Sequence, residues 1–265
     1  MYKKRLWAYI LVALLCFSTL SWANPQYTTK TDLDLSLMSA SAVMAGTGLL
    51  LGSSLKPLTR EQVNSLVMKD VLFCDRWTCV RLSQNSKTLS DVMLSISTLA
   101  PLLVLASPYL NKNQRQSYAV MYAETMAVNF SLSWLTKHLV KRIRPYVYNP
   151  AVPMEEKIRS NDARKSFYSG HTSASFASMV FLARTHAALF PNSGLKPVIW
   201  IVGLSAAAIV STNRMLSGRH FLTDVLVGAL VGSVIGYIIP EIHKKDSVNR
   251  SISDSSFSVS FQFSF

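Results

Sequence analysis

The stretch RMLSGRHFLTD, residues 214–224, separates two apolar segments near the end of the chain, and it is the starting point of the fold prediction. The segments on either side of it, 197–211 and 222–239, are apolar enough to form buried or membrane helices. Four more such segments lie earlier, at 35–55, 92–110, 118–137 and 172–190. Polar or turn-forming residues separate neighbouring segments. The sequence therefore predicts an all-α bundle of six helices.

The composition excludes several classes of protein. Of the 265 residues, 49% are hydrophobic and 15% are charged, so there is ample apolar surface to order most of the chain. Three cysteines are too few for a small disulfide-framework protein. The net charge of +13 raises nucleic acid as a partner. We expect no nucleic-acid partner, because the positive charge concentrates in the motifs below and an export signal removes the usual target.

The first 23 residues resemble an export signal. A basic start at residues 3–5 precedes an apolar run at 6–20, and small residues at 21 and 23 form a cleavage site. We predict a cleaved signal at 1–23, a helical domain at 24–245 and a strand-forming tail at 246–265. An uncleaved membrane anchor is the alternative interpretation.

The sequence leaves the membrane topology open. Segments 92–110 and 222–239 are long and apolar enough to span, whereas Glu124 and Arg184 lie within two others. We expect an exported protein, periplasmic or membrane-bound, with its site facing the periplasm. Six spans after a cleaved signal would instead bring residues 137–145 to the cytoplasm. Either one segment does not span the membrane, or the bundle is periplasmic and only associates with the membrane surface. The oligomeric state is not fixed.

Both ends of the mature chain show a period of two, and two cysteines lie close together. Apolar residues alternate with polar ones at 27–35 and at 257–265, which predicts short terminal β-strands that pair with each other. In an oxidising compartment we expect a disulfide between Cys74 and Cys79. A pair of free thiols in a cytoplasmic loop is the alternative.

A basic motif, KHLVKRIRP at 137–145, predicts an anion-binding surface. Lys137, Lys141 and Arg144 recur at i, i+4 and i+7, so they would share one face of a helix that Pro145 ends. Arg142 and Arg144 offer planar donors suited to phosphate oxygens. Alone, such a run is more often a solvated face, so its interpretation depends on the motifs downstream.

Two further motifs supply histidines. Ser169 and Gly170 form a turn before an apolar helix, whose N-terminus would favour an anion, and His171 stands at that point. His220 and Asp224 are four residues apart, so a carboxylate could hold one imidazole nitrogen and leave the other as a nucleophile. Arg214 adds another guanidinium. This set suits phosphoryl transfer, with one histidine attacking and the other protonating the leaving oxygen.

The spacing Lys-x6-Arg-Pro, Ser-Gly-His and Arg-x5-His-x3-Asp resembles the signature of the type 2 phosphatidic acid phosphatase superfamily, which includes class A acid phosphatases and vanadium haloperoxidases. The resemblance covers about residues 90–240. It implies the six-helix core of that family, with no metal and no cofactor. It also implies a role for each matching position: phosphate binding by Lys137, Arg144, Ser169, Gly170 and Arg214, nucleophilic attack by His220, orientation by Asp224, and acid catalysis by His171.

Two positions depart from the family pattern, and several functions remain in competition. Tyr168 replaces the usual proline, and Asn213 replaces a serine that would offer a hydroxyl. We expect a metal-independent phosphatase of the cell envelope acting on lipid phosphates or pyrophosphates. The alternatives are a soluble periplasmic acid phosphatase on small phosphomonoesters, a vanadium haloperoxidase, and a non-catalytic anion- or lipid-binding relative.

Overall fold

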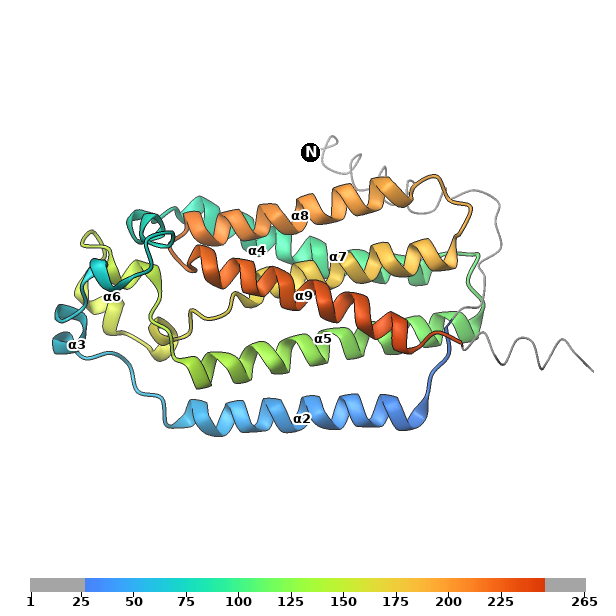
Figure 1. The fold of residues 1–265 in the computed structure, drawn as a ribbon, viewed down its shortest axis with the longest axis horizontal. Helices are drawn as coiled ribbons and strands as arrows, with labels where there is room; N and C mark the ends of the chain where they lie inside the picture. The colour runs from blue at the N-terminus through green and yellow to red at the C-terminus, as the bar shows by residue number, and fades with distance from the viewer. Residues whose placement is uncertain (1–26, 246–265) are drawn as a thin grey trace, which may run out of the picture.

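The computed structural model describes residues 27–245, and within them six long helices form an all-α bundle (Figure 1). The long helices are α2 (Thr31–Ser53), α4 (Gln84–Leu99), α5 (Lys112–Val140), α7 (Gly170–Leu189), α8 (Lys196–Leu216) and α9 (Leu222–Ile242). A 3₁₀ turn at Ala100–Ala106 extends α4. The short helices α3 (Arg60–Asn64) and α6 (Met154–Ile158) lie in the connections at one end. The predicted fold class is confirmed.

The predicted strand at 27–35 is wrong. Residues 31–53 form α2, and Asp32 and Asp34 lie in its first turn, where negative charge favours a helix N-terminus. In the described part of the chain, β structure is limited to one antiparallel bridge between Tyr27 and Lys244. The predicted strand at 257–265 lies outside the described residues, as does the signal at 1–23.

Helix α7 forms the centre of the bundle, and α9 packs closely against it. A Cβ on Gly228 would come within 2.7 Å of the carbonyl oxygen of Ser169, which caps α7, and a Cβ on Gly232 or Gly236 would come within 2.2 or 2.3 Å of a backbone carbonyl oxygen of α7. Only glycine allows two helices to approach this closely over three successive turns. This contact fixes the start of α9 beside the start of α7, and these are the places where the sequence puts His220 and His171.

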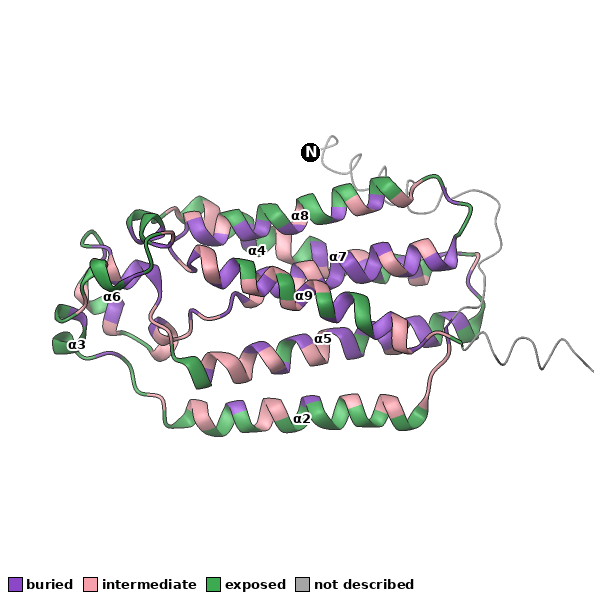
Figure 2. Ribbon diagram, in the orientation of Figure 1, coloured by how far each residue is buried: buried purple, intermediate pink, exposed green. Residues whose placement is uncertain are grey.

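Four helical stretches are long and apolar enough to cross a membrane, by length and composition. They are Thr31–Ser53, Gln84–Ala106, Lys196–Leu216 and Leu222–Ile242. Figure 2 shows exposed residues along α2 and α8, and many of these are large hydrophobic side chains, such as Leu50 on α2 and Ile201 on α8. Such a surface suits lipid better than water. The sequence had predicted only two of these stretches to be long enough.

The disulfide predicted between Cys74 and Cys79 is not formed, and both thiols are free. Cys79 is fully buried in a small hydrophobic cluster with Val71 and Phe221. Burial, together with nearby Asp75, raises the pKa of the Cys79 thiol to about 11. Because oxidation proceeds through the thiolate, this environment keeps the thiol in its unreactive form.

Candidate active site

The three motifs meet in one cavity at the end of the bundle where α7 and α9 begin. The cavity has a volume of about 390 Å³ and reaches from the last turns of α5 to the loop between α8 and α9. Six of the eight predicted catalytic and phosphate-binding residues line it: Lys137, Arg144, Gly170, His171, Arg214 and His220. The other two, Ser169 and Asp224, are fully buried behind it. Segments far apart in the sequence therefore form one positively charged pocket.

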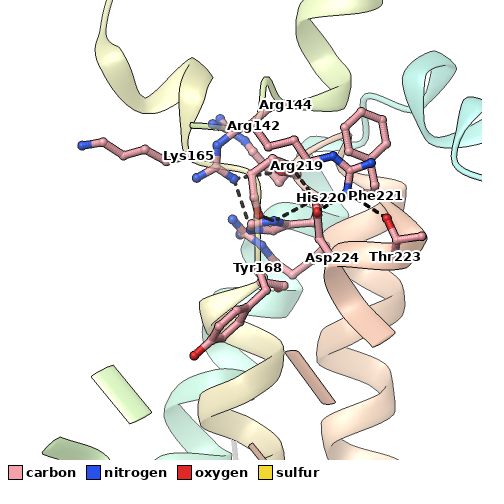
Figure 3. A network of polar contacts seen from close by, with 12 residues as sticks. Arg142, Arg144, Lys165, Tyr168, Arg219, His220, Phe221, Thr223 and Asp224 are labelled. Carbon is pink, nitrogen blue, oxygen red and sulfur yellow. Dashed lines mark hydrogen bonds and ion pairs between the residues drawn. The ribbon is translucent and has the colours of Figure 1, made fainter. Parts of the chain in front are cut away.

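Arg144 reaches the cavity from an extended segment, which corrects the predicted helix face. Helix α5 ends at Val140, and Lys141 adopts a left-handed conformation with φ of 53°. Lys141 is exposed to solvent, whereas the buried Arg144 donates to the Arg219 carbonyl at 2.8 Å (Figure 3). Arg144 also pairs with Asp162 at 2.9 Å. These two contacts, one to a backbone carbonyl and one to a carboxylate, hold the guanidinium of Arg144 at the cavity.

The hydrogen bonds of His220 determine its tautomer. The Nδ1 atom lies 2.7 Å from the carbonyl oxygen of Ser166, which can only accept, so Nδ1 carries the proton. The Nε2 atom lies 3.1 Å from a guanidinium nitrogen of Arg144, which can only donate. Nε2 therefore holds a lone pair, and His220 lines the cavity. An imidazole with this tautomer is ready to act as a nucleophile.

The surroundings of His220 keep it neutral. Burial, reinforced by the charges of Arg144, Lys137 and Arg214, lowers the pKa of His220 well below its usual 6.5. Because only a neutral imidazole has a lone pair on Nε2, the depressed pKa leaves His220 able to act as a nucleophile in mildly acidic conditions.

This pKa shift predicts how stability depends on pH. The unfolded chain takes up a proton on His220 near pH 6.5, and the folded chain resists it. The contribution of His220 to the free energy of unfolding is therefore complete above about pH 6.5 and is lost as the pH falls below that value. We expect the melting temperature in detergent to fall more steeply between pH 7 and pH 5 in the wild type than in His220→Asn. Parallel curves for the two proteins would contradict the depressed pKa.

Asp224 does not bond directly to His220, in contrast to the expected contact. Its nearest carboxylate oxygen is 3.7 Å from Nδ1 of His220, and the carbonyl of Ser166 takes that position instead. Asp224 accepts from the Ser166 hydroxyl and from the Phe221 backbone N–H at 2.9 Å. His220 lies just before α9 rather than on it, which separates the two side chains. Asp224 therefore acts on His220 through Ser166.

Arg142 contacts carboxylates and not the cavity. One guanidinium nitrogen pairs with Asp224 (Figure 3), and the other lies 2.8 Å from Asp75. Both carboxylates are fully buried. Asp75 also accepts from the backbone N–H of Thr223 at 3.0 Å and from its hydroxyl at 2.6 Å. Arg142 thus fixes the first turn of α9, and the phosphate-binding role suggested by its sequence position does not fit this geometry.

On the opposite side of the cavity, His171 is held by Asp91 of α4. The Nε2 atom of His171 lies 3.0 Å from a carboxylate oxygen of Asp91, and the same oxygen is 3.2 Å from Arg214. Asp91 is about half exposed, with 49% of its side-chain surface accessible. One carboxylate therefore connects the second histidine to Arg214, one of the two arginines that line the cavity.

Comparisons with known proteins match the part of the chain that contains the three motifs. The family model described as PAP2 superfamily matches residues 117–247, from α5 to the end of α9, where all three motifs lie. The chain belongs to the PAP2 superfamily.

Individual relatives match the PAP2 chain less completely. It is 40% identical over 88 residues to a probable diacylglycerol pyrophosphate phosphatase 1 of Schizosaccharomyces pombe, which is 31% of each chain. The match thus spans about a third of that curated relative. A transmembrane PAP2-type phosphatidylglycerolphosphate phosphatase from Bacillus subtilis is 16% identical, with a TM-score of 0.39, over 86% of this chain and 96% of the other. That score is too low to establish a shared fold by itself.

The start of α7 supplies the remaining donors of this PAP2 site. The Ser169 hydroxyl caps the helix and accepts from the Thr172 hydroxyl at 2.9 Å, so it is engaged in the cap and is not on the cavity wall. Gly170 lines the cavity, and a Cβ there would lie 2.9 Å from the Ser133 hydroxyl oxygen. The first backbone N–H groups of α7 lack helical partners, and together with Lys137 they favour an anion.

The two departures from the PAP2 pattern leave the cavity intact. Tyr168 is buried, and its carbonyl accepts a hydrogen bond from the Lys137 ammonium group. Asn213 donates its amide to the Ile209 carbonyl at 2.8 Å, within its own helix. Neither side chain lines the cavity.

Sequence reasoning missed four residues that position this site: Asp75, Asp91, Asp162 and Ser166. Each lies outside the three motifs, and each acts through a partner far away in sequence. The signal that could have found Asp75 and Asp91 is charge balance, because an apolar bundle with this many cations at one end needs carboxylates to fix them. Asp162 faces both Arg144 and Arg219, at 2.9 and 3.5 Å.

We predict that Asp91 positions His171 and Arg214 for catalysis. Asp91→Leu removes the acceptor of both groups, and we expect kcat to fall about tenfold or more, since a general acid contributes about 10²–10⁴. Asp91→Asn keeps an acceptor oxygen and should retain most of the activity. The measurement is steady-state phosphate release by both variants. Equal activity of Asp91→Leu and wild type would show that the contact has no catalytic role.

Proposed function

We propose that this PAP2 protein is a phosphatase that hydrolyses lipid phosphates or pyrophosphates through a phosphohistidine on His220. The observation that carries the proposal is the lone pair of His220 Nε2 in a cavity that also holds Lys137, Arg214 and a second histidine. The side chains of Lys137, Arg144 and Arg214 would neutralise the phosphate oxygens. That neutralisation is the main requirement of phosphoryl transfer, and we propose that it needs no metal ion here.

The proposed reaction has two steps. In the first, Nε2 of His220 forms a bond to phosphorus while the bond to the leaving oxygen breaks, and His171 gives its proton to that oxygen. In the second, His171 takes a proton from water, the water oxygen bonds to phosphorus, and the bond to Nε2 breaks. Inorganic phosphate leaves, and both histidines return to their starting protonation.

The shape of the cavity favours a substrate with an apolar tail. Beside the cations, its wall includes Leu94 from α4, and Met126, Phe130 and Trp134 from α5. Phe130 is 62% exposed on the outside of the bundle, so this apolar wall is continuous with the hydrophobic surface of α4 and α5. An anionic head group could bind the cations while its tail follows this wall. The diacylglycerol pyrophosphate phosphatase named among the relatives supports the same substrate class.

The test is phosphate release in EDTA from a panel of substrates in mixed micelles. The panel contains phosphatidic acid, diacylglycerol pyrophosphate, phosphatidylglycerol phosphate, undecaprenyl pyrophosphate and p-nitrophenyl phosphate. We expect kcat/KM for at least one lipid to exceed that for p-nitrophenyl phosphate by about tenfold or more, since burial of an apolar tail adds binding energy. Equal or higher kcat/KM for p-nitrophenyl phosphate would favour a soluble-type acid phosphatase. No release from any member would favour a non-catalytic binder.

We also propose that the site faces the outside of the cell membrane. Helix α2 runs from Thr31 toward the site end alongside α5, so in a bundle that spans the membrane a site on the outside places the start of α2 on the cytoplasmic side. Among the long helices α2 packs mainly on α5, at the edge of the bundle. The test is Glu155→Cys in a Cys74→Ser background, because Glu155 is exposed beside the site end. A membrane-impermeant maleimide should label this cysteine in intact spheroplasts. Labelling only after permeabilisation would place the site inside.

A further inference from the structure

We propose that Asp34, Glu124 and His243 bind a divalent metal ion, zinc by the chemistry of the ligands, at the end of the bundle opposite the phosphate cavity. The three residues come from the first turn of α2, from α5 and from the residue after α9. Their ligand atoms lie within 4.8 Å of one another. Nε2 of His243 is 2.9 Å from Asp34 Oδ1 and 3.1 Å from Glu124 Oε2. Imidazole and carboxylate are the ligands that zinc commonly takes together.

Glu124 gives the first independent argument. Its side chain is 1% exposed, and in the described part of the chain neither carboxylate oxygen receives a well-directed hydrogen bond, although Nε2 of His243 lies 3.1 Å from Oε2. A buried carboxylate without hydrogen bonds or a cation is strongly disfavoured. Asp34 brings a second carboxylate to the same point, which makes the need for positive charge greater.

The orientation of His243 gives the second argument. Its Nδ1 atom lies 2.8 Å from the carbonyl oxygen of Ile239, so Nδ1 carries a proton and donates it there. In the neutral ring, Nε2 then presents a lone pair to two carboxylates. Metal-binding histidines almost always donate their other ring N–H to a carbonyl or carboxylate in this way.

The dimensions suit a tetrahedral zinc site. With metal–ligand distances of about 2.05 Å, ligand atoms at the corners of a tetrahedron lie about 3.3 Å apart. The observed 2.9 and 3.1 Å require only a few tenths of an ångström of expansion. Two carboxylates and a neutral imidazole balance the charge of a divalent ion. Asp34 keeps 18% of its side-chain surface accessible, which gives the ion an entry path and leaves a fourth position for water.

The site is separate from the phosphate cavity. His220 precedes the first residue of α9 and His243 follows its last, so the length of a 21-residue helix, about 32 Å, lies between them. A metal ion here would join the edge helix α2 to α5 and α9 (Figure 1). Its binding energy would therefore stabilise the bundle, because the unfolded chain does not hold the three ligands together.

The experiment uses the full chain without a histidine tag, purified in detergent, treated with a chelator and then dialysed. Titration with Zn²⁺ and metal analysis after gel filtration should give one zinc per chain, with a melting temperature that rises with zinc concentration. Co²⁺ in place of zinc should give the visible absorption of a tetrahedral site. His243→Gln and Glu124→Gln should each lose these three signals, whereas His186→Gln, which changes another buried histidine, should keep them.

Two outcomes would overturn the proposal. If the wild-type chain binds no zinc, the cluster is an ion pair between a protonated His243 and the two carboxylates. If zinc binds equally well to His243→Gln and Glu124→Gln, the ion is held elsewhere. Neither outcome bears on phosphate release, which the substrate panel measures in EDTA.

Discussion

His220→Asn is expected to abolish phosphate release, with kcat reduced by at least about 10³-fold. Asparagine has no lone pair on nitrogen that can attack phosphorus, so the proposed covalent intermediate cannot form. His220 is 1% exposed, and asparagine is smaller and polar, so the fold should survive. The measurement is single-turnover phosphate release from the best lipid of the panel, with circular dichroism and gel filtration to verify folding.

A matched control and a trapping experiment sharpen this prediction. His138 is also 1% exposed, and its Nδ1 lies 2.8 Å from the Trp134 carbonyl, but it does not line the cavity. His138→Asn should therefore keep its activity. Acid quenching of wild type with ³²P-labelled substrate should trap label on the protein, and His220→Asn should trap none. If His220→Asn retained more than a tenth of wild-type activity, the proposed nucleophile would be wrong.

The sequence predicted the fold and the cavity well because both depend on patterns that are local or regularly spaced. Long apolar segments separated by polar turns predict helices whatever their neighbours in the fold are. Gly170, His171 and His220 occur in short sequence motifs that can be recognised without a structure. Three of the errors have a common cause. In each case the packing of neighbouring elements, which a local pattern does not contain, decides the structure. This holds for the period of two at 27–35, for the basic run from Lys137 to Arg144 and for the pair Cys74 and Cys79.

The partners of the site residues could not be predicted, since tertiary contacts decide them. Asp75 reaches Arg142 across 67 positions of sequence, and Asp91 reaches His171 across 80. The position of Asp224 also depends on tertiary contacts that its spacing from His220 does not give. A spacing of four residues brings it near His220, but the start of α9 lies between them, and the carbonyl of Ser166 occupies the place expected for the carboxylate.

Arg142→Met is expected to destabilise the protein by about 3–5 kcal/mol, because it leaves Asp75 and Asp224 as buried carboxylates without their cation. The Arg142 side chain is 23% exposed, whereas both carboxylates are fully buried. Removing one partner of such a group costs far more than the pair itself contributes. The measurement is the free energy of unfolding in detergent, followed by tryptophan fluorescence during denaturation.

Arg219→Met is the matched control for this prediction. Its side chain is also 23% exposed, but its partner Asp162 is 45% exposed and lies 3.5 Å away. Such a pair is worth about 1 kcal/mol or less, so Arg219→Met should be nearly as stable as wild type. Adding Asp75→Asn to Arg142→Met should recover part of the loss, since one unpaired charge disappears. If instead Arg142→Met were as stable as Arg219→Met and mainly raised KM, then Arg142 would bind phosphate, as its place in the basic motif first indicated, and the network around α9 would have another source of stability.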